Sequence, residues 1–495
     1  MTEPAPATIP GARAKLPFGQ KLGYAAGNAV DGIVSQVLSI FLLFYVTTVC
    51  GLPGGLAGIA LAVGLVVDAV VDPLIGSSSD GWRSRFGRRL PFMLAGLPAV
   101  AILLVAIFSL PTGLSTTALF VWLTLLSVLQ RIALSLFNLP YQAVGAELSD
   151  DYNERSSIMA WRWGLAVTGT LSVVALGFGV FFNGPGAQML RGHYTPFALT
   201  LAGILIVAGL IASRVVGATL DRQYPPAAGD GGLHVRVLRE LSEVFRNRSF
   251  RILFGSALLF FSALGTHAAL GLHTNTFFWH FTSRQTQAVT LAVFLGLLFG
   301  APLTGPFLKR LEKRTILIVG LVGLAASEAV PAGLRLLGLF PFQGDQLMWI
   351  LSAIVFVGGV LMAAGSIAFA SMMADAADEH EHLFGARREG LYHAGWAFAS
   401  KAAAGVGAFI AGMVLQLIDF PTDLAKQGAS AAARLPDTMI DALGFFYGPG
   451  AGVVYAGAIA TVFLYRLDAK SHAAILRDLK DRRAAALAGA AALVP

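Results

Sequence analysis

The chain has 495 residues, of which 56% are hydrophobic and only 13% are charged, and its mean hydropathy is +0.70. Soluble domains carry about 25% charged residues, so this composition excludes a disordered chain, a coiled coil and an ordinary soluble enzyme, and leaves an integral membrane protein. The single cysteine, Cys50, excludes an internal disulfide, a cysteine-ligated zinc site and an iron–sulfur cluster. The net charge of +7 arises from short basic runs between apolar stretches, which indicates membrane topology rather than nucleic-acid binding.

Apolar windows long enough to cross a bilayer recur along the whole chain. We expect no cleavable signal peptide before them, because the first 16 residues are polar and rich in proline and alanine. A hydrocarbon core about 30 Å thick needs roughly 20 apolar residues per helix. We therefore predict about twelve spans, near residues 23–49, 54–79, 90–111, 115–140, 157–183, 195–218, 252–279, 287–308, 314–337, 347–373, 390–418 and 442–466.

Basic residues concentrate in every second loop. With a cytoplasmic N-terminus, the inner loops hold dense groups such as Arg83, Arg85, Arg88 and Arg89. The outer segments then hold only Arg191, Arg284, Arg335, Lys426 and Arg434. The positive-inside rule therefore predicts that both termini are cytoplasmic, in a multi-pass protein of the inner membrane.

The spans divide into two halves. We predict an N-terminal tail (1–16), a six-helix bundle (17–220), a cytoplasmic connector that includes a surface helix (221–250), a second six-helix bundle (251–467) and a cytoplasmic tail (468–495) whose last twelve residues are loose. A short basic loop follows the second span of each half, which suggests parallel repeats. The stretch 419–441 is an external insert without an assigned role.

Few ionisable residues lie inside the spans, and each is a functional hypothesis because such residues are expensive in a bilayer. Asp68 and Asp72 are four residues apart and share one helix face, so either one is protonated or a cation lies between them. Alternatively, Asp72 belongs to a structural bend with Pro73. Arg131 is expected to neutralise a carboxylate on the first or second span.

The second half has three further polar positions of interest. His267 either relays protons or bonds to a neighbouring helix, and Glu328 either faces a cavity or is held protonated. Tyr392 and Trp396 open the eleventh span, where aromatic residues commonly anchor a helix at the interface.

Four segments resemble the glycoside–pentoside–hexuronide:cation symporters, the melibiose permease family. They are KLGYAAGN (21–28), VVDAVVDPLIGSSSDGWRSRFGRRLPF (66–92), FNLPYQAVGAELSDDYNERSSI (137–158) and SMMADAADEHEHLFGARREGLYHAGWAFASK (371–401). The segments lie in the family's order across nearly the whole chain. The resemblance implies an all-α integral membrane protein with the major facilitator fold, in which 12 transmembrane helices form two six-helix bundles.

Residue by residue, the resemblance places Asp68, Asp72 and Ser135 in a cation site, with Asn138 beside them. It also places Arg162 and Lys401 in a sugar site. Melibiose permease has an aspartate at the position of Asn138, a tryptophan at that of Gln142 and an aspartate at that of Gly32, so Asp31 stands one residue early, about 100° around the helix. These departures argue against an α-galactoside substrate and weaken the case for sodium over protons.

Sugars present hydroxyl arrays and one apolar face, which suit polar side chains beside an aromatic ring. The predicted substrate-binding residues are Tyr24, Asp31, Asn138, Gln142, Trp161, Arg162 and Lys401. Charge-assisted hydrogen bonds between helix ends can close the inner side of a carrier. The predicted gating residues are Asp80, Arg85, Arg88, Arg89, Arg387, Arg388 and Glu389.

The sequence therefore favours a secondary transporter that couples Na⁺ or H⁺ to the symport of a sugar, glycoside or uronide by alternating access. It predicts no enzymatic activity, no cofactor besides the coupling ion and no metal beyond a sodium ion at Asp68 and Asp72. We expect a monomer that contacts membrane lipid and a small-molecule substrate, and no nucleic acid. Two other classes remain: a sodium-linked carrier of lysolipids or other amphiphiles, and a non-transporting membrane sensor or enzyme.

Overall fold

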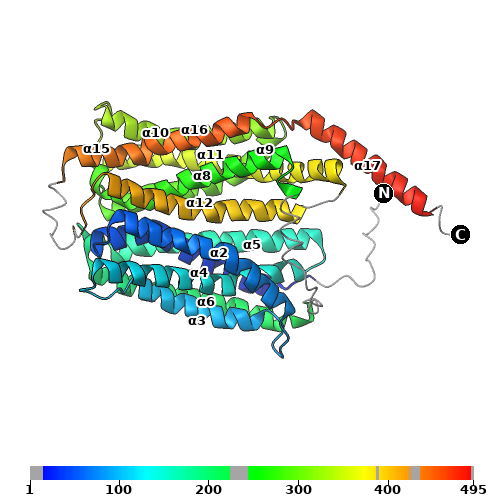
Figure 1. Cartoon of the computed structure of the whole chain (residues 1–495), viewed down its shortest axis with the longest axis horizontal. Coiled ribbons are helices and arrows are strands. Elements are labelled where there is room, and N and C mark those ends of the chain that lie inside the picture. Colours follow the sequence, from blue (N-terminus) through cyan, green and yellow to red (C-terminus); the bar gives the residue numbers. More distant parts are fainter. Residues whose placement is uncertain (1–14, 223–242, 386–388, 423, 425–434, 492–495) are drawn as a thin grey trace. The chain divides into compact units, whose positions relative to one another are not determined.

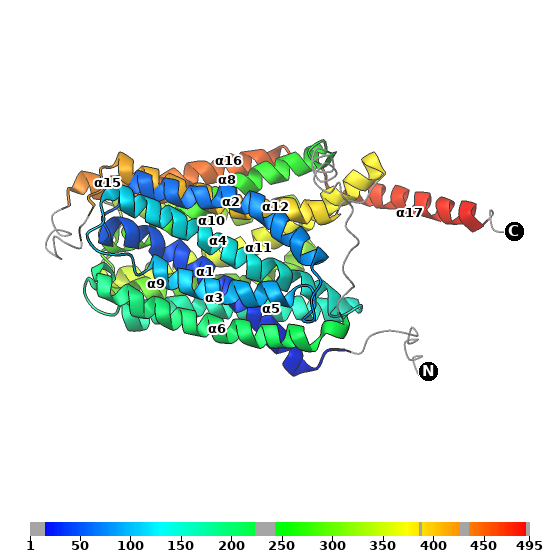
Figure 2. The same cartoon turned by 60° about the horizontal axis from the view of Figure 1, so that its bottom comes forward.

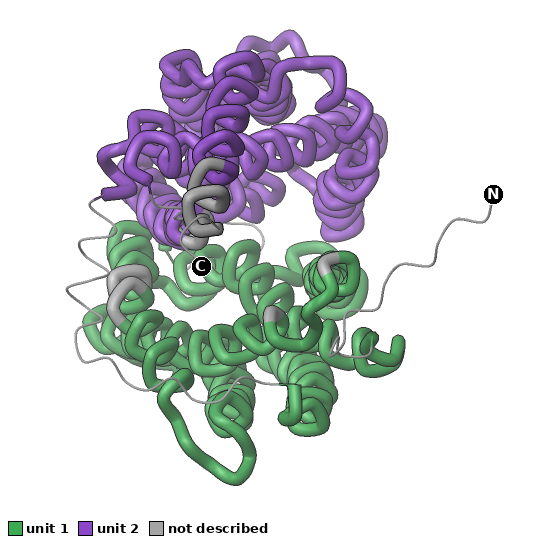
Figure 3. Tube along the Cα trace, turned by 90° about the vertical axis from the view of Figure 1, so that its right-hand side faces the viewer, with its two compact units in different colours: residues 1–229, 421–429 green, residues 230–420, 430–495 purple. Residues whose placement is uncertain are grey.

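The computed structural model describes residues 15–222, 243–385, 389–422, 424 and 435–491. Across these ranges the regular elements are all helical, and they form two compact units (Figure 3). Unit 1 comprises residues 1–229 and 421–429, and unit 2 comprises residues 230–420 and 430–495. Most of the predicted surface helix in the connector lies outside the described residues, as does part of the 419–441 insert.

Unit 1 contains six long helices (Figure 1). They are α1 (Phe18–Val37), extended by the turn η1 (Leu38–Leu42), α2 (Gly54–Gly81), α3 (Leu90–Ile107), α4 (Thr116–Glu147), α5 (Tyr152–Leu176) and α6 (Tyr194–Ala218). Short π-helices, η2 (Tyr45–Val49) and η3 (Gly177–Phe181), and short 3₁₀-helices, η4 (Ala187–Met189) and η5 (Arg191–His193), lie between them, and the 3₁₀-helix η6 (Leu220–Arg222) follows α6.

Unit 2 repeats this plan. Its helices are α8 (Arg248–His273), α9 (Ser283–Leu308), α10 (Lys313–Leu336), α11 (Gly344–Phe384), α12 (Glu389–Leu417), α15 (Asp437–Phe445) and α16 (Ala451–Phe463). The turn η7 (Thr274–Phe278) extends α8, and the turn η8 (Phe446–Gly450) joins α15 to α16. A last helix, α17 (Ala469–Ala491), follows.

The predicted membrane spans are present as helices. Within the described ranges, eleven helices are long and apolar enough to cross a membrane. The remaining predicted span is α2, a 28-residue helix that carries Asp68 and Asp72 in its second half and is apolar over Gly54–Gly64. Because 28 residues exceed the roughly 20 that a bilayer core requires, α2 is also long enough to span it. The chain is a multi-pass membrane protein.

The helices pair in the same way in both units. In unit 1, α1 packs on α5 and α6, α4 packs on α2 and α3, and α3 packs on α6. In unit 2, α8 packs on α12 and α16, α11 packs on α9 and α10, and α10 packs on α16. The helices of each unit can be followed from two directions in Figures 1 and 2. This matching order supports the internal repeat that the basic loops suggested.

Glycines allow the closest of these pairings. A Cβ atom at Gly32 of α1 would lie 2.2 Å from the carbonyl oxygen of Ala166 on α5, and a Cβ at Gly169 of α5 would lie 2.7 Å from that of Ala29. Gly265 of α8 and Gly407 of α12 meet in the same manner in unit 2. A side chain at Gly32 therefore does not fit unless α1 and α5 move apart.

Two sequence-based expectations for unit 2 are wrong. Tyr392 is fully buried in the hydrophobic core of the unit, and Trp396 packs on Phe369 with 4.3 Å between ring centroids, so neither is an interfacial anchor. The C-terminal residues expected to be a loose tail continue as helix α17 up to Ala491. This helix is held to α11 by ion pairs, including Arg483 with Glu381 at 2.6 Å.

We predict that Gly32→Ala destabilises the protein by about 1–3 kcal/mol, because the methyl group overpacks the contact between α1 and α5. Gly164→Ala on α5 is the matched control, since a Cβ there meets nothing within 4 Å. That change should be neutral or stabilising by up to about 1 kcal/mol, because alanine favours helix over glycine. Thermal unfolding of the purified variants in detergent tests this, and equal melting temperatures would contradict it.

Candidate functional site

Polar side chains of α4 line up along one face of the helix. Arg131, Ser135, Asn138 and Gln142 follow one another at intervals of four, three and four residues. The first three of these reach carboxylates on α2 and α1. We call the set formed by Asp31, Asp68, Asp72, Arg131, Ser135 and Asn138 the polar ladder.

Each carboxylate of the polar ladder contacts a different residue of α4. Arg131 Nη1 lies 2.6 Å from Asp68 Oδ2, and Ser135 Oγ donates a hydrogen bond of 2.5 Å to Asp72 Oδ1. The two partners on α2 are four residues apart, and so are the two partners on α4. The contacts therefore join the two helices at positions one helical turn apart. On α1, Asp31 Oδ1 accepts a hydrogen bond of 2.8 Å from Asn138 Nδ2.

A glycine makes room for the arginine of the ladder. Gly64 lies one turn before Asp68 on α2, and a Cβ there would lie 2.7 Å from both Cδ and Nε of Arg131. The Arg131 side chain therefore passes close over Gly64 and reaches Asp68, which is 8% exposed. The expectation that Arg131 pairs with a carboxylate on the first or second span is confirmed.

Arg162 is held by aromatic rings of α1 and α4. Its guanidinium lies 5.0 Å from the ring centroid of Tyr141 and 5.9 Å from that of Tyr24, an arrangement that favours a cation. Each tyrosine hydroxyl donates to a backbone carbonyl of the other helix: Tyr24 to Tyr141 at 2.6 Å and Tyr141 to Tyr24 at 2.9 Å. Asn28 Oδ1 also accepts from Arg162 Nη2 at 3.4 Å.

The other predicted substrate-binding residues have different surroundings. Tyr24 is fully buried, so here it presents no ring to a ligand. Trp161 is 39% exposed and packs edge-on against Phe18, so the structure does not bring it to the Arg162 guanidinium. Gln142 is exposed one turn beyond Asn138, and Lys401 is exposed on α12 of unit 2.

A second charged cluster lies where α2 and α4 end and α3 begins. Glu147 of α4 pairs with Arg89 at 2.7 Å and also with Arg88. Asp80 of α2 pairs with Arg89 at 3.1 Å and with Arg88 at 3.8 Å. Burial lowers the pKa of Arg89, and Glu147 and Asp80 favour its charged form. Three of the predicted gating residues thus meet within unit 1.

The remaining gating residues are placed differently. Arg85 is exposed and lies over the ring of Phe86. Arg387 and Arg388 lie outside the described residues, and Glu389 is the first residue of α12. The acidic run before them does form contacts, since Asp375 pairs with Lys313 at 2.6 Å and Asp378 with His472 of α17 at 3.1 Å.

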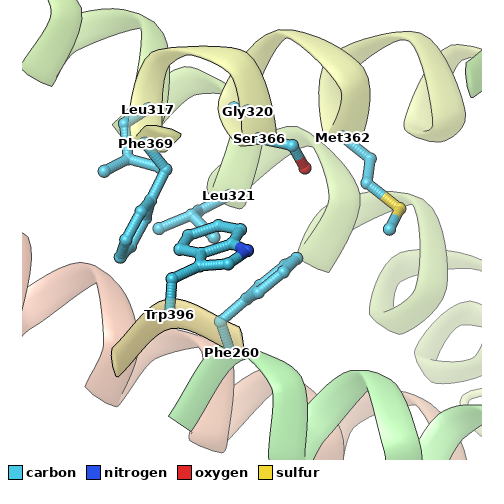
Figure 4. A pocket seen from close by; sticks show the side chains of 9 residues that line it. Phe260, Leu317, Gly320, Leu321, Met362, Ser366, Phe369 and Trp396 are labelled. Carbon is cyan, nitrogen blue, oxygen red and sulfur yellow. The ribbon is translucent and has the colours of Figure 1, made fainter. Parts of the chain in front are cut away.

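Unit 2 contains a small pocket with an apolar lining (Figure 4). The side chains of Phe260, Phe369 and Trp396 approach one another there, and Ser366 supplies a hydroxyl group. Aromatic packing therefore dominates this part of the unit. It has none of the carboxylate and amide contacts that characterise the polar ladder.

Two further residues, Asn28 and Glu147, have contacts that emerge only in the structure. Asn28 is four residues after Tyr24 and three before Asp31, so the same helical spacing that revealed the ladder on α4 also marks one face of α1. Glu147 is the last residue of α4, and its sequence position alone assigns it no role. Its partners, Arg89 and Arg88, lie 58 and 59 residues earlier in the chain, directly before α3. Only the fold therefore reveals the contact.

We predict that Glu147→Gln destabilises the protein by about 3–5 kcal/mol, because it removes the buried partner of two arginines. Asp80→Asn should cost at most about 1 kcal/mol, because the Asp80 side chain is 49% exposed and its pairs are screened by solvent. Thermal unfolding of the two variants in detergent compares them. A larger loss for Asp80→Asn would contradict this ranking.

Comparison with known proteins places the chain among transporters. The family model described as MFS/sugar transport protein matches residues 23–469. A putative glycoside/cation symporter of Escherichia coli is 24% identical over 95% of this chain and 96% of its own. A putative sulfoquinovose importer of Salmonella typhimurium is 23% identical over 95% of this chain and 94% of its own.

A solved structure shares the fold. The D-xylose-proton symporter superposes with a TM-score of 0.59 at 15% identity, covering 92% of this chain and 99% of its own. The matched proteins are transporters and not enzymes. The fold, the matched family model and these relatives agree with the resemblance seen in the sequence. The chain belongs to the MFS/sugar transport family and is a symporter-like member of the major facilitator superfamily, similar to the glycoside–pentoside–hexuronide:cation symporters.

Proposed function

We propose that this protein couples the entry of Na⁺ or H⁺ to the uptake of a sugar, glycoside or uronide by alternating access. It works in the inner membrane with both termini in the cytoplasm, as the distribution of basic residues predicts. The observation that carries the proposal is the polar ladder. It places three carboxylates against α4 in an apolar bundle, where such groups are costly unless they bind a cation or a proton.

Arg131 neutralises one of the three carboxylates of the ladder without a bound ion. Its guanidinium supplies the positive charge that Asp68 requires, at 2.6 Å. A coupling cation that binds between Asp68 and Asp72 therefore has to displace Arg131 from Asp68. Arg131 acts in this scheme as a tethered competitor of the ion, and its displacement links ion binding to a rearrangement of α2 against α4.

The substrate side of the proposal rests on the neighbouring polar groups. Asp31, Asn138 and Gln142 offer acceptors and donors for hydroxyl groups, and Arg162 offers a charge for a uronate or another anionic group. The names of the relatives, a glycoside/cation symporter and a sulfoquinovose importer, support both a neutral and an acidic sugar. Lys401 is proposed as a further contact, from the resemblance alone.

The direct test is the thermal stability of the purified protein with mono-, di- and trisaccharides, uronates and a sulfonated sugar, with and without sodium, at two pH values. A ligand at about a hundredfold excess over its Kd stabilises the folded state by about 2.7 kcal/mol. We expect a sugar-specific rise that sodium or low pH enlarges. A rise with lysolipid and none with any sugar would instead support the amphiphile carrier.

We predict that Arg131→Gln lowers the cation concentration needed for the half-maximal effect by roughly tenfold, equivalent to about 1.4 kcal/mol, because the ion no longer displaces a bound guanidinium. Arg310→Gln, which removes an exposed positive charge in unit 2, is the control and should leave this concentration unchanged. Cation titrations at a fixed sugar concentration measure it. An unchanged or higher value for Arg131→Gln would refute the competitor role.

We also predict that Ser135→Ala reduces the stabilisation by the cation and leaves the protein folded. The change removes the hydroxyl group that bonds Asp72 and creates no buried charge. The same titration, together with the melting temperature without ligands, measures both effects. A full response to the cation in Ser135→Ala would show that this hydroxyl group takes no part in ion binding.

A further inference from the structure

Unit 2 contains a buried acidic residue that the polar ladder of unit 1 does not involve. Glu328 of α10 is 8% exposed, and its position lies about 22 Å along the helix from Lys313. No lysine or arginine forms an ion pair with it among the residues that the structure describes, and its Oε2 atom accepts no hydrogen bond there. A carboxylate in such surroundings is costly unless it binds a proton.

A histidine lies directly opposite this carboxyl group. His267 of α8 places Nδ1 3.3 Å from Glu328 Oε2 and 3.4 Å from the carbonyl oxygen of Tyr447. Because a carbonyl can only accept a hydrogen bond, this geometry suits a hydrogen on Nδ1. That hydrogen lies between two acceptors, so His267 can turn it toward the carboxylate when Glu328 is charged.

Two tyrosines complete the surroundings. The ring of Tyr447 in η8 stacks on the imidazole of His267, with 3.9 Å between centroids. The hydroxyl group of Tyr455 in α16 neighbours the carboxyl group of Glu328. Gly448 allows η8 to lie this close, because a Cβ there would come within 3.1 Å of the Glu328 carbonyl oxygen.

The other charged groups near these helices are directed elsewhere. Arg335, two turns further along α10, lies over the rings of Phe278 and Trp279 and interacts with Asp441 of α15. From α11, Gly358 faces Ser327, the residue before Glu328. The groups that face Glu328 are therefore His267, Tyr447 and Tyr455, from α8, η8 and α16.

We propose that Glu328 and His267 form a proton-binding site in unit 2, separate from the polar ladder of unit 1. In one state the carboxyl group holds the proton and the site is neutral. In the other state the proton leaves to water, and the carboxylate is stabilised by His267 and Tyr455. Loss of the proton leaves a negative charge on α10, which the groups from α8 and α16 then stabilise.

Infrared difference spectroscopy of the purified full-length protein tests this without any substrate. We expect a protonated carboxyl C=O band that disappears as pH rises between about 5 and 10 in the wild type and is absent from Glu328→Gln. Asp72→Asn, in the polar ladder, is the matched control and should keep the band. A band that is unchanged in Glu328→Gln, or that does not respond to pH in the wild type, would overturn the proposal.

A second variant separates proton binding from a purely structural role. His267→Asn keeps Glu328 in place and removes the imidazole, so it should change the pH midpoint of the band. An unchanged midpoint would exclude His267 from the site. Because no sugar is used, these outcomes stand apart from the thermal-shift test: an absent sugar response refutes the proposed transport function and leaves the proton site intact.

Discussion

A carboxylate within an apolar bundle needs a partner on a neighbouring helix, and in unit 1 this requirement determines how α1, α2 and α4 meet. Arg131 contacts Asp68 and Ser135 contacts Asp72, so the two helices are joined at matching positions one turn apart. Asn138 extends the series to Asp31 on α1. The same contacts that remove the cost of the charges also create a place where an added cation or proton changes the balance.

Small residues make these polar contacts possible. Gly64 lets the Arg131 side chain lie against α2, and Gly32 lets α1 approach α5 so closely that no Cβ fits. The acidic residue of α1 stands at the preceding position, where Asp31 reaches Asn138. In this unit, close helix packing at glycines and the positions of the charged side chains therefore depend on each other.

Sequence reasoning predicted the fold well, because long apolar windows and alternating basic loops follow directly from bilayer thickness and topology. It also predicted that Arg131 neutralises a carboxylate on the first or second span, and the structure shows that this partner is Asp68. It did not find that Tyr24 is sealed within the bundle or that Glu147 holds two arginines. Helical spacing gives the face of a helix, and only tertiary packing decides which neighbour that face meets.

Reconstitution into vesicles tests the central claim most directly, namely that the free energy of an ion gradient drives sugar accumulation. A sugar identified by its stabilising effect would be presented to proteoliposomes under an inward sodium gradient, an inward proton gradient or neither. We predict accumulation above the external concentration with one of the two gradients, and its loss in Asp72→Asn. Equilibration to the external concentration under all three conditions would contradict cation coupling and show a carrier without it.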